Sequence, residues 1–272
     1  MKGRKFKTVV IIFFLCIITA LFMFPIYWFI TTSLKQTKDI WVMPIKWFFT
    51  PTLNNYAEVV KNAPLPFLNS VIVTVFSILI SFVFGLPCAY ALGRFSIKYK
   101  ENIAVTFLSQ FMLPPMALIV AFYIFFNSLH LLGTRFNLIL AYVTFDLPLV
   151  VWLMKDYFEG IPKEIDEAAL VDGCSPFGSF FRVSLPLAKP GVMVAGIMCF
   201  IFTWNEYLYA IILTKRNTQT LPLLLGLFYR QYEVAWGSIA ALGIITILPV
   251  VFFGILIQRR LVRGLTLGAL KE

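Results

Sequence analysis

Residues 159–190 read EGIPKEIDEAALVDGCSPFGSFFRVSLPLAKP, and they form the one markedly polar stretch in an otherwise apolar chain. Pro162 suits the first position of a helix. Glu164, Asp166 and Glu167 suit the positively polarised N-terminal end of that helix, and Gly173 suits a left-handed stop. A helix of about eleven residues is roughly 16 Å long, against about 30 Å of hydrocarbon in a bilayer. The stretch therefore predicts a short helix that does not cross a membrane.

A second short helix is predicted directly after the first. Ser175 and Pro176 suit its cap and its first position, and it would run toward Arg182. The two helices would form a helical elbow outside the membrane, and residues 159–190 are called the elbow below. The alternative for its central residues is an ordinary interfacial amphipathic helix that ends at a glycine cap. Those central residues alone do not separate the two interpretations.

The composition places the chain in the membrane class before any motif is considered. Of 272 residues, 60% are hydrophobic and only 13% are charged, with 29 phenylalanines and a mean hydropathy of +0.86. No soluble globular domain has this balance. Windows of about 20 residues with few charges predict an all-α membrane protein with six transmembrane helices in a single domain, residues 1–272. The predicted spans lie near residues 9–32, 68–93, 103–126, 138–155, 190–213 and 236–257.

The orientation follows from the basic residues. The first span comes after Lys2, Arg4, Lys5 and Lys7, but its apolar run is too long for a signal peptide, so a retained signal-anchor helix is expected. Most of the 23 lysines and arginines fall on the same side of the predicted spans as the N-terminus. The positive-inside rule then predicts that both termini and the elbow are cytoplasmic. The net charge of +10 indicates attraction to anionic membrane lipid rather than to nucleic acid.

The residues that usually carry catalysis or bind metals are poorly represented. The four cysteines have no metal-ligand spacing, and the single histidine, His130, has no clustered partner. No phosphate-binding Gly-x-x-x-x-Gly-Lys-Ser/Thr loop and no nucleophile-elbow serine are present, so neither a catalytic residue nor a metal site is predicted. Energy for any transport must then come from a partner or from an ion gradient.

Two other classes of membrane protein are alternatives to a transporter driven by a partner protein. An ion-coupled secondary transporter would show inverted repeats and charged residues near the membrane midplane. The sequence has no convincing internal repeat, and Asp146 and Glu206 are the acidic residues well inside predicted spans. An intramembrane enzyme would need paired carboxylates or metal ligands within the spans, which the sequence lacks.

Four segments together resemble one family. Glu167-Ala168-Ala169, Gly173 and Leu185-Pro186 have the spacing of the loop by which permease subunits of binding-protein-dependent ABC importers dock on their ATPase. The segment 89–95, AYALGRF, resembles the Ala-Tyr-Ala-Leu-Ala-Arg-Phe signature of carbohydrate-importer permeases, with Gly93 at the usual alanine. Segment 204–207, WNEY, resembles that family's Trp-Asn-Glu-Phe, and the tail from 258 to 271 is similar to its C-terminal ending. From about residue 68 onward the chain resembles the maltose-type second permease of such importers.

The resemblance implies a transmembrane permease domain for a sugar or oligosaccharide in the plasma membrane of a prokaryote. It implies a second homologous permease, two ATP-binding subunits and an extracytoplasmic sugar-binding protein as partners. No cofactor is expected in this chain, because ATP and Mg²⁺ would bind the partner ATPase subunits. The elbow would transmit closure of the ATPase to the spans and so drive alternating access. The residues expected to couple to the ATPase are Glu164, Glu167, Ala168, Ala169, Asp172, Gly173, Leu185 and Pro186.

A substrate path through the spans is the last expectation. Acidic side chains inside a span are costly unless they face water or a partner, so Asp146 and Glu206 are functional candidates. Helical spacing places Tyr142 with Asp146, and Asn205 and Glu206 with Tyr209. Carboxylates and aromatic rings suit the wall of a sugar cavity. The alternative is that Glu206 bonds another helix or the partner permease and has a structural role.

The outer loops carry two further predictions. Residues 34–67 contain Trp41, Trp47 and Phe48, a pattern typical of a segment at the membrane interface. Residues 214–235 form a polar loop with a position suited to a docked binding protein, although a merely solvated loop fits equally well.

Overall fold

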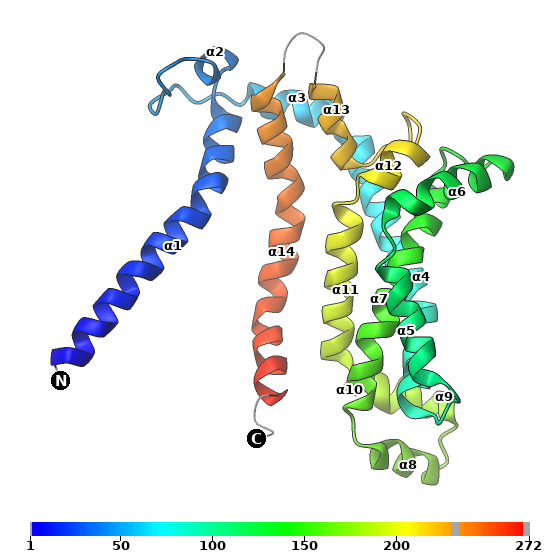
Figure 1. Ribbon diagram of the computed structural model, residues 1–272. Helices are drawn as coiled ribbons and strands as arrows, with labels where there is room; N and C mark the ends of the chain where they lie inside the picture. The colour runs from blue at the N-terminus through cyan, green and yellow to red at the C-terminus, as the bar shows by residue number, and fades with distance from the viewer. Residues whose placement is uncertain (1, 230–233, 269–272) are drawn as a thin grey trace. The chain divides into compact units, whose positions relative to one another are not determined.

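The computed structural model describes residues 2–229 and 234–268, and the side chains of residues 7–229 and 234–255. Residues 230–233 of the predicted polar loop and residues 269–272 of the predicted tail lie outside the described part. Helices dominate the described residues, and no strand longer than the single bridge between Tyr229 and Val234 occurs among them. The prediction of an all-α membrane protein is confirmed. The helices are α1 Lys2–Leu34, α2 Thr37–Ile40, α3 Asn54–Asn62, α4 Pro64–Arg94, α5 Lys100–Phe111, α6 Pro115–Ser128, α7 Arg135–Glu159, α8 Lys163–Val171, α9 Pro176–Ser179, the π-helix η1 Phe180–Ser184, α10 Leu185–Leu187, α11 Lys189–Trp204, α12 Leu208–Leu213, the 3₁₀-helix η2 Leu221–Leu224, α13 Leu225–Phe228 and α14 Trp236–Gly268 (Figure 1).

Four helices in the described part of the chain are long and apolar enough to cross a membrane. They are Lys7–Leu34 within α1, Pro64–Arg94, Arg135–Glu159 and Trp236–Ile255 within α14. Two further pairs of helices pass the same test together, but each pair is sharply bent. The chain therefore has four candidate spans, or up to six if each bent pair counts as one.

The third predicted span, near residues 103–126, is two helices in the structure. α5 ends at Phe111 and α6 begins at Pro115, and the two axes differ by 85° (Figure 1). Pro114 has extended backbone angles, and Pro115 takes the first helical position. Because a proline lacks an N–H group and its ring clashes with the preceding turn, two consecutive prolines end one helix and start another.

The fifth predicted span, near residues 190–213, is also interrupted. α11 ends at Trp204 and α12 begins at Leu208, so residues 205–207 form a break within the predicted segment. A second bend of 77° separates Pro176–Leu187 from Lys189–Trp204 and lies where the elbow meets α11. The break at residues 205–207 leaves the polar side chains of Asn205 and Glu206 next to a helix end.

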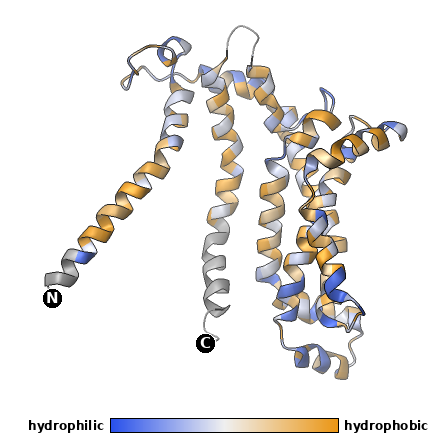
Figure 2. Cartoon of the chain, in the orientation of Figure 1, coloured by the Kyte–Doolittle hydropathy of each residue, from blue (hydrophilic) through white to orange (hydrophobic). Residues whose placement is uncertain are grey.

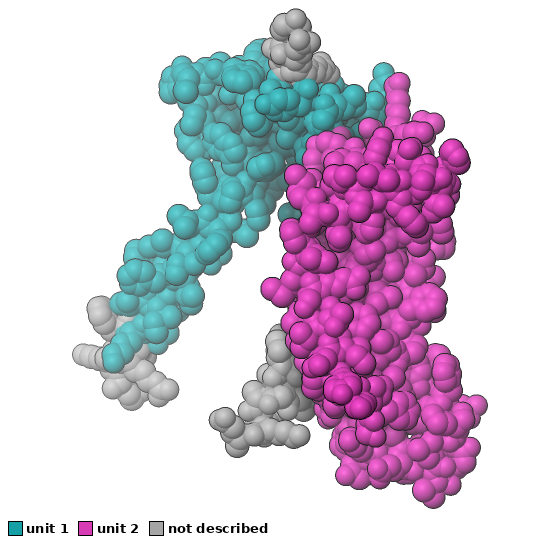
Figure 3. All heavy atoms as spheres, turned by 45° about the vertical axis from the view of Figure 1, so that its right-hand side comes forward, with its two compact units in different colours: residues 1–64, 224–248 teal, residues 65–223, 249–272 magenta. Residues whose placement is uncertain are grey.

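The described residues divide into two compact units, where the sequence predicts a single domain (Figure 3). Unit 1 comprises residues 1–64 and 224–248, and unit 2 comprises residues 65–223 and 249–272. Within unit 1, α3 is bonded to both of the long helices. The Asn55 side chain donates to the backbone oxygens of Ser33 and Lys35, at 2.8 and 2.9 Å, and Ser238 donates to the Glu58 carboxylate at 2.6 Å.

Unit 2 holds two apolar cores. One contains Tyr90, Met154, Phe158 and Phe180 and lies toward the elbow. The other contains Tyr142, Tyr209 and other buried residues from α4, α6, α7 and α12. In Figure 1, α8 of the elbow lies at one end of unit 2, and α6 and α12 lie at the opposite end. Hydrophilic residues gather at the elbow end of this unit, as Figure 2 shows.

Candidate functional site

The elbow consists of two short helical segments, as the sequence predicts. α8 begins at Lys163, one residue later than expected, because Pro162 is the extended residue that precedes it. Glu164 and Asp166 lie in the first turn of α8, where the helix dipole favours acidic groups. The chain leaves α8 through Gly173, which has φ +87°, so the predicted left-handed stop is confirmed.

The second segment of the elbow begins with the predicted cap. The Ser175 hydroxyl accepts a hydrogen bond from the backbone N–H of Gly178 at 3.1 Å, and Pro176 is the first residue of α9. The chain then passes through the π-helix η1 into α10 and on to α11. The elbow is therefore built from locally specified helix starts and stops.

A buried carboxylate holds the elbow to the rest of unit 2. Asp166 Oδ2 lies 2.7 Å from Nε of Arg94, at the end of α4. Asp166 Oδ1 accepts hydrogen bonds from the hydroxyls of Ser179 at 2.6 Å and of Tyr90 at 3.3 Å, and also from that of Ser184. We call these five residues the elbow anchor. A carboxylate removed from water needs a cation and several donors, and the anchor supplies both.

Other contacts strengthen the same junction between α4 and the elbow. Arg94 Nη1 donates to the backbone oxygen of Ile161, just before α8, at 2.6 Å. The Tyr90 ring packs on Phe158 of α7 and Phe180 of η1, with centroids 5.4 and 5.0 Å apart. The segment 89–95 and the elbow, which appear in the sequence as two separate signatures, are thus one physical junction.

None of the predicted coupling residues takes part in the side-chain bonds of the anchor described above, and most of them are exposed. Glu164, Glu167, Ala168, Asp172, Gly173 and Pro186 are exposed, Leu185 is half-buried and Ala169 is buried. The same surface carries exposed apolar side chains, of which Val171 is 88% exposed, Phe177 67% and Phe181 53%. The elbow thus has an inner side bonded to α4 and an outer side that combines acidic and apolar groups.

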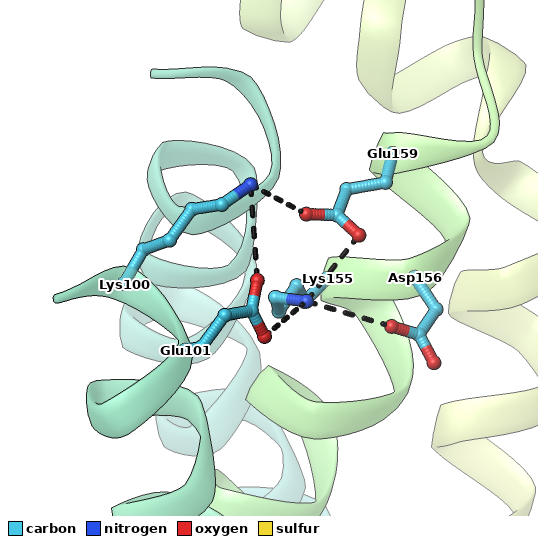
Figure 4. Close-up of polar contacts among 5 residues, drawn as sticks. All are labelled: Lys100, Glu101, Lys155, Asp156 and Glu159. Carbon is cyan, nitrogen blue, oxygen red and sulfur yellow. Dashed lines mark hydrogen bonds and ion pairs between the residues drawn. The ribbon is translucent and has the colours of Figure 1, made fainter. Parts of the chain in front are cut away.

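A second charged cluster lies at the same end of unit 2, where α5 begins and α7 ends (Figure 4). Lys155 Nζ lies 3.4 Å from Glu101, 3.9 Å from Asp156 and 3.3 Å from Glu159. Lys100 Nζ lies 3.1 Å from the other carboxylate oxygen of Glu159 and 3.8 Å from Glu101. We call these five residues the ion-pair network. This network was not predicted from the sequence.

Three of the predicted substrate-path residues, Tyr142, Glu206 and Tyr209, form a third polar cluster, at the end of unit 2 opposite the elbow. The Tyr142 hydroxyl donates to Glu206 Oε2 at 2.9 Å. Glu206 also accepts hydrogen bonds from the backbone N–H groups of Tyr209 at 2.8 Å and Ala210 at 3.2 Å. It therefore caps α12 after the break at residues 205–207. This arrangement matches the structural alternative for Glu206, and it also leaves the carboxylate half-buried at a cavity wall.

The remaining path residues differ in their surroundings. Asp146 is fully buried and accepts a hydrogen bond from the Thr203 hydroxyl at 2.9 Å. Asn205 is exposed, and its side chain bonds back to Ile201. Glu206 and Tyr209 line a cavity of about 230 Å³ at the bend between α5 and α6, together with Gln110 and Thr144. The structure thus brings Tyr142, Glu206 and Tyr209 together and places Asp146 behind them, away from that cavity.

Residues suited to metal binding are scattered. Within residues 7–229 and 234–255, no group of three or more His, Cys, Asp or Glu side chains is placed to hold a metal ion. The elbow anchor and the ion-pair network are instead satisfied by lysine, arginine and hydroxyl donors from this chain.

Comparison with known proteins identifies the class. The chain belongs to the family of binding-protein-dependent transport system inner membrane components, whose sequence profile matches residues 81–267. This finding confirms the predicted transport class and does not favour an ion-coupled secondary transporter.

Individual relatives cover almost the whole chain. It is 34% identical to the sulfoquinovosyl glycerol transport system permease protein SmoH of Agrobacterium fabrum, over 92% of this chain and 89% of that protein. It is 30% identical to the trehalose/maltose transport system permease protein MalG of Thermococcus litoralis, over 100% and 99%. Its fold resembles a chain of a bacterial ABC transporter involved in the import of the acidic polysaccharide alginate, with TM-score 0.78, 22% identity and 95% and 98% coverage.

Proposed function

We propose that this chain is the permease subunit of an ATP-driven importer for a sugar or a small oligosaccharide. Family membership supports the transporter class. The names of SmoH and MalG support the carbohydrate class, because both relatives carry glycosides or disaccharides and both align over nearly their full length. We further propose that the chain acts as one transmembrane permease domain, residues 1–272, with six spans, one of them formed by α5 with α6 and another by α11 with α12.

The elbow, residues 159–190, is the proposed docking surface for an ATP-binding subunit. Its outer side presents Glu164, Glu167, Ala168, Asp172 and Gly173 with the exposed apolar side chains of Val171, Phe177 and Phe181. Such a mixture of acidic and large apolar groups is typical of a protein interface rather than of a solvated loop. ATP and Mg²⁺ would bind the ATPase and not this chain.

The observation that carries the proposal is the elbow anchor. A docking segment transmits a displacement only if it moves as a body with the spans. Asp166 is bonded to Arg94 of α4 and to Ser179 and Ser184 of the second elbow segment. Because the charge is buried, separating these groups is costly, so a push on α8 would reach α4 rather than bend the elbow.

Partners and orientation complete the proposal. The family description names dependence on a binding protein, which supports an extracytoplasmic sugar-binding protein as partner. A second, homologous permease and two ATP-binding subunits would complete the complex. The basic residues support cytoplasmic termini and a cytoplasmic elbow in a prokaryotic plasma membrane.

Substitution on the outer side of α8 tests the docking role. Val171→Asp places a charge on a side chain that is 88% exposed, so the fold of this chain should be unaffected. If Val171 is buried by the ATPase, uptake and ATPase stimulation in the reconstituted complex should fall about tenfold or more. The matched control is Asp156→Asn, an exposed charge change at the same end of unit 2. Unchanged uptake in Val171→Asp would contradict docking at this surface.

The substrate path, predicted from Tyr142, Asp146, Asn205, Glu206 and Tyr209, is proposed to pass the cavity at the α5–α6 bend, which Glu206 and Tyr209 line. Glu206→Gln keeps an oxygen that accepts from the N–H groups of α12 but removes the charge. A cavity role predicts altered uptake rates among labelled di- and trisaccharides while assembly of the complex survives. Loss of assembly with normal transport per assembled complex would assign Glu206 a structural role.

A further inference from the structure

A pocket in unit 1 is lined by charged and aromatic side chains that the transport mechanism does not use. It has a volume of about 310 Å³ and lies among the end of α1, helix α2, the segment after α2 and the start of α14. Three tryptophans and three charged residues line it, and we call it the tryptophan pocket. These residues are Trp28, Trp41, Trp236, Lys35, Asp39 and Lys46.

The pocket lies where two candidate membrane spans end. The candidate span in α1 ends at Leu34, and the candidate span in α14 begins at Trp236. Both span ends meet at α3, through the bonds of Asn55 to Ser33 and of Ser238 to Glu58. Tryptophan is enriched where hydrocarbon gives way to headgroups. These two features together predict that the tryptophan pocket lies at the depth of the lipid headgroups.

The charges of the pocket do not cancel. Asp39 and Lys46 form an ion pair at 2.7 Å, so their charges compensate each other. Lys35 is only 4% exposed, and its ammonium lies 5.2 Å from the ring centroids of both Trp28 and Phe49. Among the described side chains, no carboxylate is within ion-pair distance of Lys35. The pocket thus carries one net positive charge, on the ammonium group of a buried lysine, and aromatic rings compensate it only partly.

The chain beside the pocket is open to lipid. Met43 and Phe48, in the segment that follows α2, are almost fully exposed, and Trp47 is also exposed. Exposed large apolar side chains at headgroup depth are typical of segments that insert into the acyl region. A lipid whose chains pack against this segment has its headgroup level with the pocket.

We propose that the tryptophan pocket binds the phosphodiester of a phospholipid headgroup. A phosphodiester carries one negative charge, which matches the one net positive charge of the pocket, and it accepts hydrogen bonds from an ammonium group. A neutral sugar would suit the tryptophan walls but would leave the Lys35 charge uncompensated. The inference is independent of the proposed substrate and of the elbow.

Native mass spectrometry of the full-length protein tests this site. The probes are phosphatidylglycerol and a glucosyl diacylglycerol with the same chains, which lacks phosphate. We expect the most tightly bound phosphatidylglycerol molecule to have a dissociation constant at least about tenfold lower than that of the glycolipid. Lys35→Met should remove this preference. The matched control is Lys38→Gln, which removes one exposed charge on α2 outside the pocket and should leave the preference unchanged.

A second variant distinguishes loss of the binding site from misfolding of the Lys35→Met protein. Asp39→Asn raises the net charge of the pocket, so phosphatidylglycerol should bind more tightly, a gain that a folding defect does not produce. Equal binding of the glycolipid, or equal losses in Lys35→Met and Lys38→Gln, would overturn the site. Displacement of the lipid by millimolar glycerol 3-phosphate would assign the pocket to a soluble phosphate. Displacement by a neutral disaccharide would assign it to a sugar.

Discussion

The elbow anchor and the ion-pair network use the same kinds of side chain at the same end of unit 2, yet they differ in environment. In the anchor, the side chains of Arg94 and Asp166 are 4% and 12% exposed, and hydroxyl donors fill the remaining positions around the carboxylate. In the network, Glu101 and Asp156 are 65% and 70% exposed, and contacts of 3.1–3.9 Å join charges that water also reaches. Burial, and not the number of ion pairs, should therefore decide how much each cluster contributes.

Removal of the anchor cation should have the largest effect. Arg94→Met leaves Asp166 buried without its partner, which typically costs about 3–5 kcal/mol. We expect a large fall in the thermal stability of the purified protein, together with loss of uptake. Arg182→Met, which removes an exposed arginine from the same elbow, is the control and should change stability by less than about 0.5 kcal/mol. Equal stability of the two variants would show that the anchor is no more important than a surface charge.

A bulky side chain at Gly93 should have the second-largest effect on thermal stability, because this residue lies between the two clusters. A Cβ atom there would be 3.1 Å from the backbone oxygen of Lys155 and from Cβ of Phe158, so α4 and α7 approach closely. Gly93→Val should force the helices apart and cost about 1–3 kcal/mol in thermal stability. Gly93→Ala should be close to neutral, since a small shift offsets the gain in helix propensity of about 1 kcal/mol. A Val variant as stable as the Ala variant would mean that the contact is loose.

Substitution of Lys155 should lower the thermal stability less than Arg94→Met or Gly93→Val, although the Lys155 side chain is only 8% exposed. Lys155→Met removes the centre of the network but leaves Glu101, Asp156 and Glu159 accessible to water. We expect a loss of about 1 kcal/mol, measured by thermal unfolding in low salt, because solvated carboxylates need no partner. A loss as large as that of Arg94→Met would break the distinction between the two clusters.

Substitution of Lys100 should have the smallest effect on thermal stability, and the size of this effect should depend on salt concentration. Lys100→Gln removes a half-exposed partner of Glu159, so the expected loss is below about 0.5 kcal/mol at low ionic strength. At 0.5 M salt the difference from the unsubstituted protein should disappear, because exposed charges are screened. Arg94→Met measured in the same series should keep most of its loss in high salt. A salt-insensitive effect at Lys100 would contradict the exposed character of the network.

The parts of the fold that depend on local chemistry could be predicted from the sequence. Gly173 and Ser175 specify a stop and a cap through their own backbone and hydroxyl groups, and the structure contains both. The break between α5 and α6 has a local cause in Pro114 and Pro115, but hydrophobicity alone predicts a continuous span there. The break at residues 205–207 has no such marker, because Glu206 is stabilised at the start of α12 partly by Tyr142 of α7.

The parts that depend on tertiary contacts could not be predicted. Asp166 suits the first turn of a helix in any context, and nothing near it in sequence indicates that Arg94 is its partner. A partial signal was present: Tyr90 and Arg94 are four residues apart and so share one face of α4. Two polar groups on one face at the end of an apolar helix require partners elsewhere, but their identity depends on the packing of α4 against the elbow.

The anchor also has a consequence for synthesis of the chain. Arg94 leaves the ribosome 72 residues before Asp166, a delay on the order of ten seconds at typical translation rates. Throughout that interval the guanidinium group must remain hydrated, so α4 is inserted with a charged end that cannot yet be buried. The serines of the second elbow segment emerge later still. The junction between α4 and the elbow therefore forms well after α4 is synthesised, and a nascent chain stopped before Ser184 would lack one of its hydroxyl donors.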